Sequence, residues 1–108
     1  KYVRPALGIE VDEQLNLRLQ MIAGRRGVFV LLVQPGSASQ RAGLLGIRAT
    51  QEGIVPGDLI TAIDGKSIGG VTGLLAQMDD RRVGDIVVLS VEREGKAREV
   101  RVELQPGT

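Results

Sequence analysis

The chain contains no histidine, no cysteine and no tryptophan, and only one tyrosine and one phenylalanine among its 108 residues. Without histidine it lacks the base of Ser–His catalysis and the commonest metal ligand in proteins. Without cysteine it forms no disulfides. With two aromatic rings it has no stacking platform for single-stranded nucleic acid. We therefore expect no catalytic site, no cofactor and no metal within this chain.

An excess of charge and a long apolar run are also missing. Fourteen basic residues stand against thirteen acidic ones, for a net charge of +1, so electrostatics give no reason to expect nucleic acid or an anionic membrane as a partner. No apolar run approaches the roughly 20 residues that span a bilayer, and we expect no membrane insertion. The sequence begins abruptly at Lys1 and shows no signal peptide, which indicates a fragment of a longer protein.

Aliphatic residues and glycine are what the sequence has in quantity. Hydrophobic residues make up 43% of the chain, so its core is expected to consist of Val, Leu and Ile. The 15 glycines are about twice the usual share of roughly 7%, and their scatter predicts many tight turns. The length fits one domain spanning residues 1–108, with a core at 4–104 and a tail at 105–108.

The hydrophobic pattern predicts short strands joined by glycine turns. A continuous β-branched run predicts a buried strand, and two alternating segments around Glu94-Gly95-Lys96 predict an antiparallel hairpin with one buried face. Residues 45–54 read as a polar loop. The clearest predicted strands are Val28–Val33, Leu59–Ile63, Lys66–Ile68, Ile86–Arg93 and Ala97–Leu104.

Two segments predict helices, and a third is ambiguous. Ser37–Gly43 has a candidate N-cap and a glycine stop, and Val71–Asp80 places apolar residues at helical spacing. Asp12–Gly24 fits a short helix and an arm of a hairpin equally well. The resulting fold class is α+β, mostly β: a small, partly open antiparallel sandwich or barrel of five to six strands capped by two helices.

The stretch Arg4–Asp12 is the most informative part of the sequence. It combines Pro5 and Gly8 with an alternating apolar series at Leu7, Ile9 and Val11, which predicts a loop that runs directly into a strand. Free backbone N–H groups in such a loop can hold an anion. An exposed strand edge after it can accept an extended peptide.

Four blocks in a fixed order carry a resemblance to a known family. They are Pro5–Ile9, Gly27–Val30, Pro-Gly-Ser-Ala-Ser-Gln-Arg-Ala-Gly-Leu from Pro35, and Gly-Asp-Leu-Ile-Thr-Ala-Ile-Asp-Gly-Lys-Ser-Ile from Gly57, the most specific of the four. The chain resembles a PDZ domain from Arg4 to Leu104, and more narrowly the PDZ domain that follows the protease domain in HtrA/Deg serine proteases. This resemblance implies the bacterial chain order, in which no strand precedes the loop and Ala97–Leu104 completes the sheet.

The resemblance also implies a site. A carboxylate-binding loop would comprise Ala6, Leu7, Gly8 and Ile9, with glycine there because it lets a ligand approach closely. The peptide groove would comprise Ile9, Glu10, Val11, Val71, Leu75 and Met78. Arg4 is a candidate for charge assistance, although a solvated surface arginine is the alternative. Leu75 and Met78 are equally compatible with the core.

The expected function is that of a non-catalytic regulatory module of an HtrA/Deg-type protease. It would bind C-termini or unfolded segments by β-strand addition and act on the protease domain of its parent chain. Assembly into a homo-oligomer through the parent is the alternative, and the PDZ module of a different membrane or processing protease is a third reading. By resemblance, the compartment would be extracytoplasmic: periplasm, cell envelope or organelle lumen.

Overall fold

The computed structural model describes residues 4–107 and is mostly β. The expected fold class is confirmed, except that three helices are present in this part of the chain instead of two, and the sheets do not close into a barrel. The strands are β1 (Pro5–Ala6), β2 (Ile9–Glu10), β3 (Val28–Phe29), β4 (Leu32–Val33), β5 (Arg48–Thr50), β6 (Gly53–Val55), β7 (Leu59–Ile63), β8 (Lys66–Ser67), β9 (Ile86–Arg93), β10 (Lys96–Glu103) and β11 (Gln105–Pro106). The helices are α1 (Glu13–Ala23), α2 (Ala38–Arg41) and α3 (Val71–Met78). No helix in residues 4–107 is long and apolar enough to cross a membrane.

The main sheet runs in the order β10-β9-β7-β3, with β8 paired to β7 as the fifth strand. The predicted hairpin is present as β9 and β10, which pair from Ile86 opposite Glu103 to Arg93 opposite Lys96. Alternation along β9 buries Val87, Leu89 and Val91, as one-sided burial of an antiparallel sheet requires.

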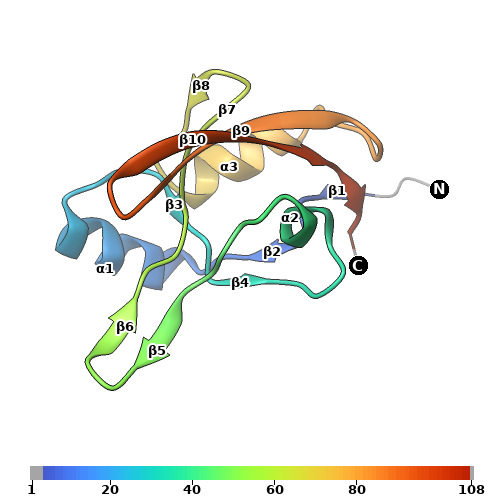
Figure 1. Cartoon of the computed structure of the whole chain (residues 1–108). Helices are drawn as coiled ribbons and strands as arrows, with labels where there is room; N and C mark the ends of the chain where they lie inside the picture. The colour runs from blue at the N-terminus through green and yellow to red at the C-terminus, as the bar shows by residue number, and fades with distance from the viewer. Residues whose placement is uncertain (1–3, 108) are drawn as a thin grey trace.

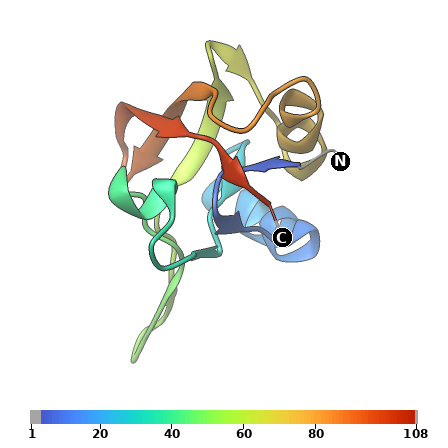
Figure 2. The same ribbon diagram turned by 90° about the vertical axis from the view of Figure 1, so that its right-hand side faces the viewer.

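Three two-stranded sheets surround the main sheet: β1 with β11, β2 with β4, and β5 with β6. The β1–β11 pair brings segments from opposite ends of the sequence side by side (Figures 1 and 2). The β5–β6 hairpin projects away from the rest of the molecule in both views.

The ambiguous segment is the helix α1. Asp12 caps its start, because the Asp12 side chain accepts a hydrogen bond of 2.8 Å from the amide of Leu15. Gly24 ends it in the left-handed conformation, with φ +65°. Within α1 the polar Asn16 is buried, whereas the adjacent apolar Leu17 is exposed. Hydrophobicity alone therefore does not identify the face of the helix that packs on the protein.

Four details of the sequence prediction were wrong. Val28–Val33 is not one strand: β3 pairs with β7 and β4 pairs with β2, so the chain passes from one sheet to another between them. Residues 45–54 contain β5 and the start of β6 instead of a loop. Residues 105–106 form a strand instead of part of a tail. A short strand, β1, does precede the predicted loop, and its partner is β11, which follows Ala97–Leu104.

The core is aliphatic, as composition predicts. Its main cluster joins the inner faces of the sheet to α2 and α3 and includes Leu7 of the predicted loop. The single phenylalanine, Phe29, lies in a smaller cluster with Leu19 and Leu59. Because Leu7 is 5% exposed, the loop that carries it is anchored to the core rather than free in solvent.

An ion pair with a buried carboxylate joins the segment before β7 to the end of β9. Asp58 is fully buried and accepts hydrogen bonds from Arg93 Nε at 3.0 Å, from Arg93 Nη2 at 2.8 Å and from the amide of Leu45 at 2.8 Å. The hydrogen bonds that Arg93 donates to Asp58 raise the pKa of the Arg93 guanidinium above its usual value. Asp58 therefore ties two segments that are far apart in the sequence to each other.

Candidate functional site

A groove of about 530 Å³ lies between the loop–β2 segment and α3. Its lining is mainly apolar, with aliphatic side chains on both walls and one charged residue of each sign among the lining residues. The lining residues are Arg4, Pro5, Ala6, Leu7, Ile9, Val11, Leu74, Leu75, Met78 and Asp79.

One edge of β2 faces away from its only strand partner in residues 4–107. The amide of Gln34 donates to the carbonyl of Gly8 at 2.9 Å, and Ile9 lies opposite Val33. This pattern makes Ile9 and Val33 a non-hydrogen-bonded pair, so the N–H and C=O of Ile9 point away from β4. In both views α3 lies on that other side of β2 (Figures 1 and 2). The free main-chain groups of Ile9 therefore border the groove.

The carbonyls of the loop are bonded on the side away from the groove. The Ser39 hydroxyl donates to the carbonyl of Leu7 at 2.6 Å, and the Gln34 amide donates to that of Gly8. All described peptide bonds are trans, and a trans peptide unit holds its C=O and N–H in opposite directions. The N–H groups of Gly8 and Ile9 consequently point to the opposite side. Within residues 4–107, the amides of Leu7 and Gly8 have no hydrogen-bond acceptor.

Gly8 is required by both backbone conformation and space. Its φ is +82°, a region that residues with a Cβ seldom adopt. A Cβ on Gly8 would also lie 2.5 Å from the Cβ of Ser37 and 2.9 Å from Oε1 of Gln105. The sequence suggested ligand approach as the reason for glycine, and the structure supplies another reason: α2 and β11 pack directly against this residue.

Most of the site residues predicted from sequence come together. Those that line the groove are Arg4, Ala6, Leu7, Ile9, Val11, Leu75 and Met78. Gly8 lies between lining residues, the exposed Glu10 continues β2, and Val71 is half-buried against the core but does not line the groove.

Burial distinguishes the core residues of α3 from those that line the groove. Leu74 is 3% exposed and belongs to the core, whereas Leu75 is 57% exposed and lines the groove. Met78 is partly buried and does both. The wall of the groove on α3 is thus made by the side chains that the core does not fully enclose.

Several supporting residues were missed from the sequence. Ser39 was read only as part of a short helix and Gln105 as part of a tail, whereas the expected N-cap at Ser37 is confirmed. In the structure Ser37 caps α2 through its hydroxyl, which accepts from the amide of Gln40 at 3.1 Å. Gln105 Oε1 accepts from the amide of Ala38 at 3.0 Å. The block of small residues after Pro35 was the available signal, because small side chains permit such close packing.

Two charges of opposite sign, Arg4 and Asp79, line the groove. The carbonyl of Arg4 accepts from the amide of Gly107 at 2.7 Å, which fixes the Arg4 backbone just before β1. In the described part of the chain its guanidinium makes no ion pair, and it is exposed. It is therefore available to an anion at the groove, with the modest strength of an exposed pair.

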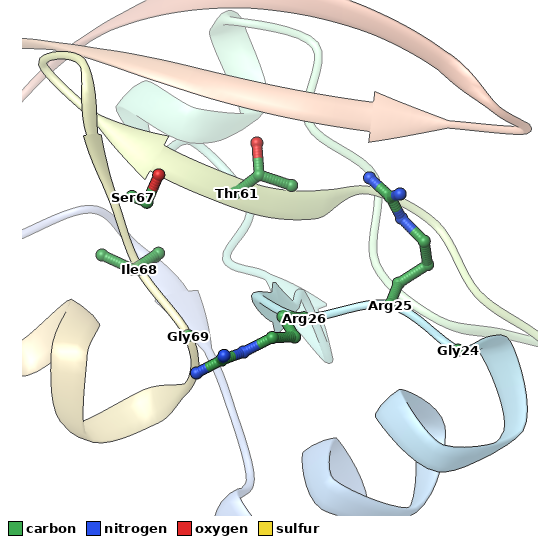
Figure 3. A pocket seen from close by; sticks show the side chains of 7 residues that line it. All are labelled: Gly24, Arg25, Arg26, Thr61, Ser67, Ile68 and Gly69. Carbon is green, nitrogen blue, oxygen red and sulfur yellow. The ribbon is translucent and has the colours of Figure 1, made fainter.

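A second hollow, also of about 530 Å³, shares no residue with the groove (Figure 3). Arg25 and Arg26 diverge from the end of α1 to two sides of it, facing β7 and Gly69 respectively. Arg25 is already ion-paired with Glu92, and the Thr61 hydroxyl donates to the carbonyl of Ser90 at 3.2 Å. This hollow lacks the aliphatic helix wall of the groove, so we assign the candidate site to the groove.

The sequence profile of the PDZ domain family matches residues 5–104. The chain belongs to the PDZ domain family. The PDZ domain is similar to part of the periplasmic serine endoprotease DegP of Salmonella typhimurium, at 36% identity over 99 residues, which are 92% of this chain and 18% of DegP. The resemblance to HtrA/Deg proteases is confirmed, and the chain spans about a fifth of the length of that relative.

Solved structures agree with the fold. The HtrA-type protease AlgW, solved with a decapeptide, superimposes with a TM-score of 0.75 at 25% identity, covering 98% of this chain and 30% of AlgW. The HtrA3 PDZ domain, bound to the phage-derived ligand FGRWV, gives a TM-score of 0.68 at 19% identity, covering 96% of this chain and 88% of that one. The second comparison supports the PDZ fold alone.

Proposed function

We propose that this PDZ domain binds the C-terminal ends of polypeptides by β-strand addition along the free edge of β2. The observation that carries the proposal is the direction of the Gly8 and Ile9 amides, which point away from the bonded carbonyls of their own peptide units. A terminal carboxylate at the end of the groove would accept hydrogen bonds from the amides of Leu7, Gly8 and Ile9 in this loop. The peptide backbone would then pair with β2 along Ile9, Glu10 and Val11.

The walls of the groove favour an apolar last residue in the ligand. Its side chain would lie between Leu7 and Ile9 on one side and Leu75 and Met78 on the other, all of them aliphatic. Val71 would stand at the mouth, beyond the lining residues. The contact is small and the ligand must become ordered on binding. We therefore expect a dissociation constant on the order of micromolar, which corresponds to a binding free energy of roughly −8 kcal/mol.

The parent protein is proposed to be an HtrA/Deg-type serine protease, with this domain as its non-catalytic regulatory module. Bound C-termini or unfolded segments would be delivered to a protease domain in the parent chain or would release it allosterically. The similarity to DegP and AlgW supports this assignment. The periplasmic location in the name of DegP supports an extracytoplasmic compartment for this chain as well.

Calorimetric titration with matched peptides tests the binding mode. One peptide ends in valine with a free carboxylate, and its partner is identical except for a C-terminal amide. Because the amide removes the charge that the loop accommodates, we expect at least tenfold weaker binding, equivalent to about 1.4 kcal/mol. Equal affinity for the two peptides would refute the carboxylate loop.

A role in assembly of the parent protein is the second candidate function. It is favoured by an exposed apolar patch on α1, where Leu17 is 54%, Met21 84% and Ile22 83% exposed. Ultracentrifugation of the full-length parent separates the two roles. Met21→Glu should weaken assembly and spare peptide binding, whereas Leu75→Glu in the groove should do the reverse. Loss of assembly in Leu75→Glu, with no peptide affinity in the unmodified protein, would favour the structural role for the groove.

A further inference from the structure

Ser39 makes an unusual long-range contact for a serine within a helix. It lies in α2 and is fully buried, yet its hydroxyl donates to Leu7, 32 residues earlier in the chain, at 2.6 Å. A buried hydroxyl is costly without a partner, so this bond is expected to persist in the folded state. The hydroxyl is therefore a fixed feature behind the loop.

The contact fixes the orientation of one particular peptide unit. The carbonyl of Leu7 and the N–H of Gly8 belong to the same trans peptide and point in opposite directions. When Ser39 holds the carbonyl, the N–H of Gly8 is turned to the other side. A rotated Leu7–Gly8 unit would instead present its carbonyl oxygen there, which would repel a carboxylate.

Glycine makes such a rotation accessible unless something prevents it. Gly8 adopts a φ of +82°, but without a Cβ it populates positive and negative φ with similar ease. The next unit, Gly8–Ile9, is held by the backbone amide of Gln34. Ser37 and Gln105 contact the position of a Gly8 Cβ, but they make no hydrogen bond to the Leu7 carbonyl. Among the described residues, only the Ser39 hydroxyl bonds this carbonyl.

We propose that Ser39 is a positioning residue for the carboxylate site: its hydroxyl holds the Leu7–Gly8 peptide unit so that the Gly8 amide faces the ligand. The inference rests on the proposed function, because it concerns the same loop. It makes the preference for a free C-terminus over an amidated one depend on a side chain outside the groove.

The test compares the discrimination ratio, the dissociation constant for the amidated peptide divided by that for the free-acid peptide, in four proteins. In Ser39→Ala the ratio should fall about tenfold, since one charge-assisted hydrogen bond is lost. Ser39→Cys keeps a donor at this position, although a larger and weaker one, and should give an intermediate ratio. It serves as the decisive variant if Ser39→Ala does not fold. Ser37→Ala is the matched control: it removes another buried hydroxyl of the same region, bonded to Gln40 and not to Leu7, and should leave the ratio unchanged.

The outcomes distinguish failure of the proposed carboxylate site from failure of the proposed role of Ser39. If the unmodified domain binds both peptides equally, the proposed carboxylate site is wrong, whatever Ser39 does. If the unmodified domain discriminates and the Ser39 variants keep its ratio, the site stands and the role of Ser39 is overturned. The ratio is the informative quantity because a purely structural loss would weaken binding of both peptides together.

Discussion

Gly8→Ala is the substitution that tests the loop most sharply. An alanine at φ +82° is expected to cost about 1–2 kcal/mol, because the left-handed region brings Cβ close to the backbone. The new methyl would also lie 2.5 Å from the Cβ of Ser37, so α2 or the loop must move. Overpacking of this kind costs about 1–3 kcal/mol. The two contributions together predict a loss of about 2–5 kcal/mol in the free energy of unfolding.

Gly36→Ala provides the matched control. Gly36 has nearly the same conformation, with φ +77°, but nothing lies within 4 Å of a Cβ placed there. Only the conformational cost of about 1–2 kcal/mol should remain. Urea denaturation of both variants measures the difference, which should be about 1–3 kcal/mol and reports the packing of the loop against α2.

The same two variants should differ in ligand binding. Gly8→Ala displaces the amides of the loop and should weaken binding of the free-acid peptide by at least tenfold, about 1.4 kcal/mol. Gly36→Ala should bind as the unmodified domain does. If the two variants are equally stable and bind equally well, the loop is not packed as described and the reasoning from Gly8 fails.

Three further predictions concern the walls, the rim and the core. Leu74→Ala should lower the free energy of unfolding by about 2–5 kcal/mol, whereas Leu75→Ala should change stability little and weaken peptide binding several-fold. Urea denaturation measures the stability of both variants and calorimetry their peptide binding. A larger loss of stability in Leu75→Ala than in Leu74→Ala would contradict the assignment of Leu74 to the core. Arg4→Gln should weaken binding of the free-acid peptide about two- to fivefold at low salt and less at high salt, so an effect independent of salt would contradict an electrostatic role. Arg93→Met removes two hydrogen bonds from the buried Asp58 and leaves Arg98, at 3.8 Å, as its remaining cation. We expect it to lower the free energy of unfolding by about 1–3 kcal/mol, and no measurable loss would show that the pair is unimportant for stability.

Elements with a local signal could be predicted from the sequence. The β9–β10 hairpin alternates between buried and outward residues over 86–91 and 99–103, on either side of a glycine turn, and its pairing follows from that pattern. Helix α3 has one apolar stripe, and α2 has the serine cap that the sequence indicated. In each case, the residues that determine the element lie within it.

Elements determined by distant partners were not predictable in this way. In α1 the buried Asn16 donates to the carbonyl of Gly27 at 3.0 Å and accepts from the amide of Phe29 at 2.8 Å, while its neighbour Leu17 is exposed. A hydrophobic pattern assigns these two residues the wrong way round. Val28–Val33 likewise reads as one strand, because a continuous apolar run reports burial and does not report which sheet provides the partner.

The candidate site likewise combines residues that have a local sequence signal with residues that have none. Leu7, Ile9 and Leu75 could be named because they lie in recognisable blocks with an apolar period. Ser39 and Gln105 could not be assigned a role, because their contacts with the loop and α2 connect residues 32 and 67 positions apart. Sequence patterns thus named residues that line the groove but missed groups that bond to the neighbouring backbone.

The central claim is that the amides of the Leu7–Ile9 loop bind a terminal carboxylate. Nuclear magnetic resonance of the ¹⁵N-labelled domain tests it directly, with the free-acid and amidated peptides titrated in parallel. The account predicts downfield shifts of the Gly8 and Ile9 amide protons with the free acid, reduced or absent with the amide. Shifts with both peptides that spare these amides, or that centre on Arg25 and Arg26 at the second hollow, would contradict it.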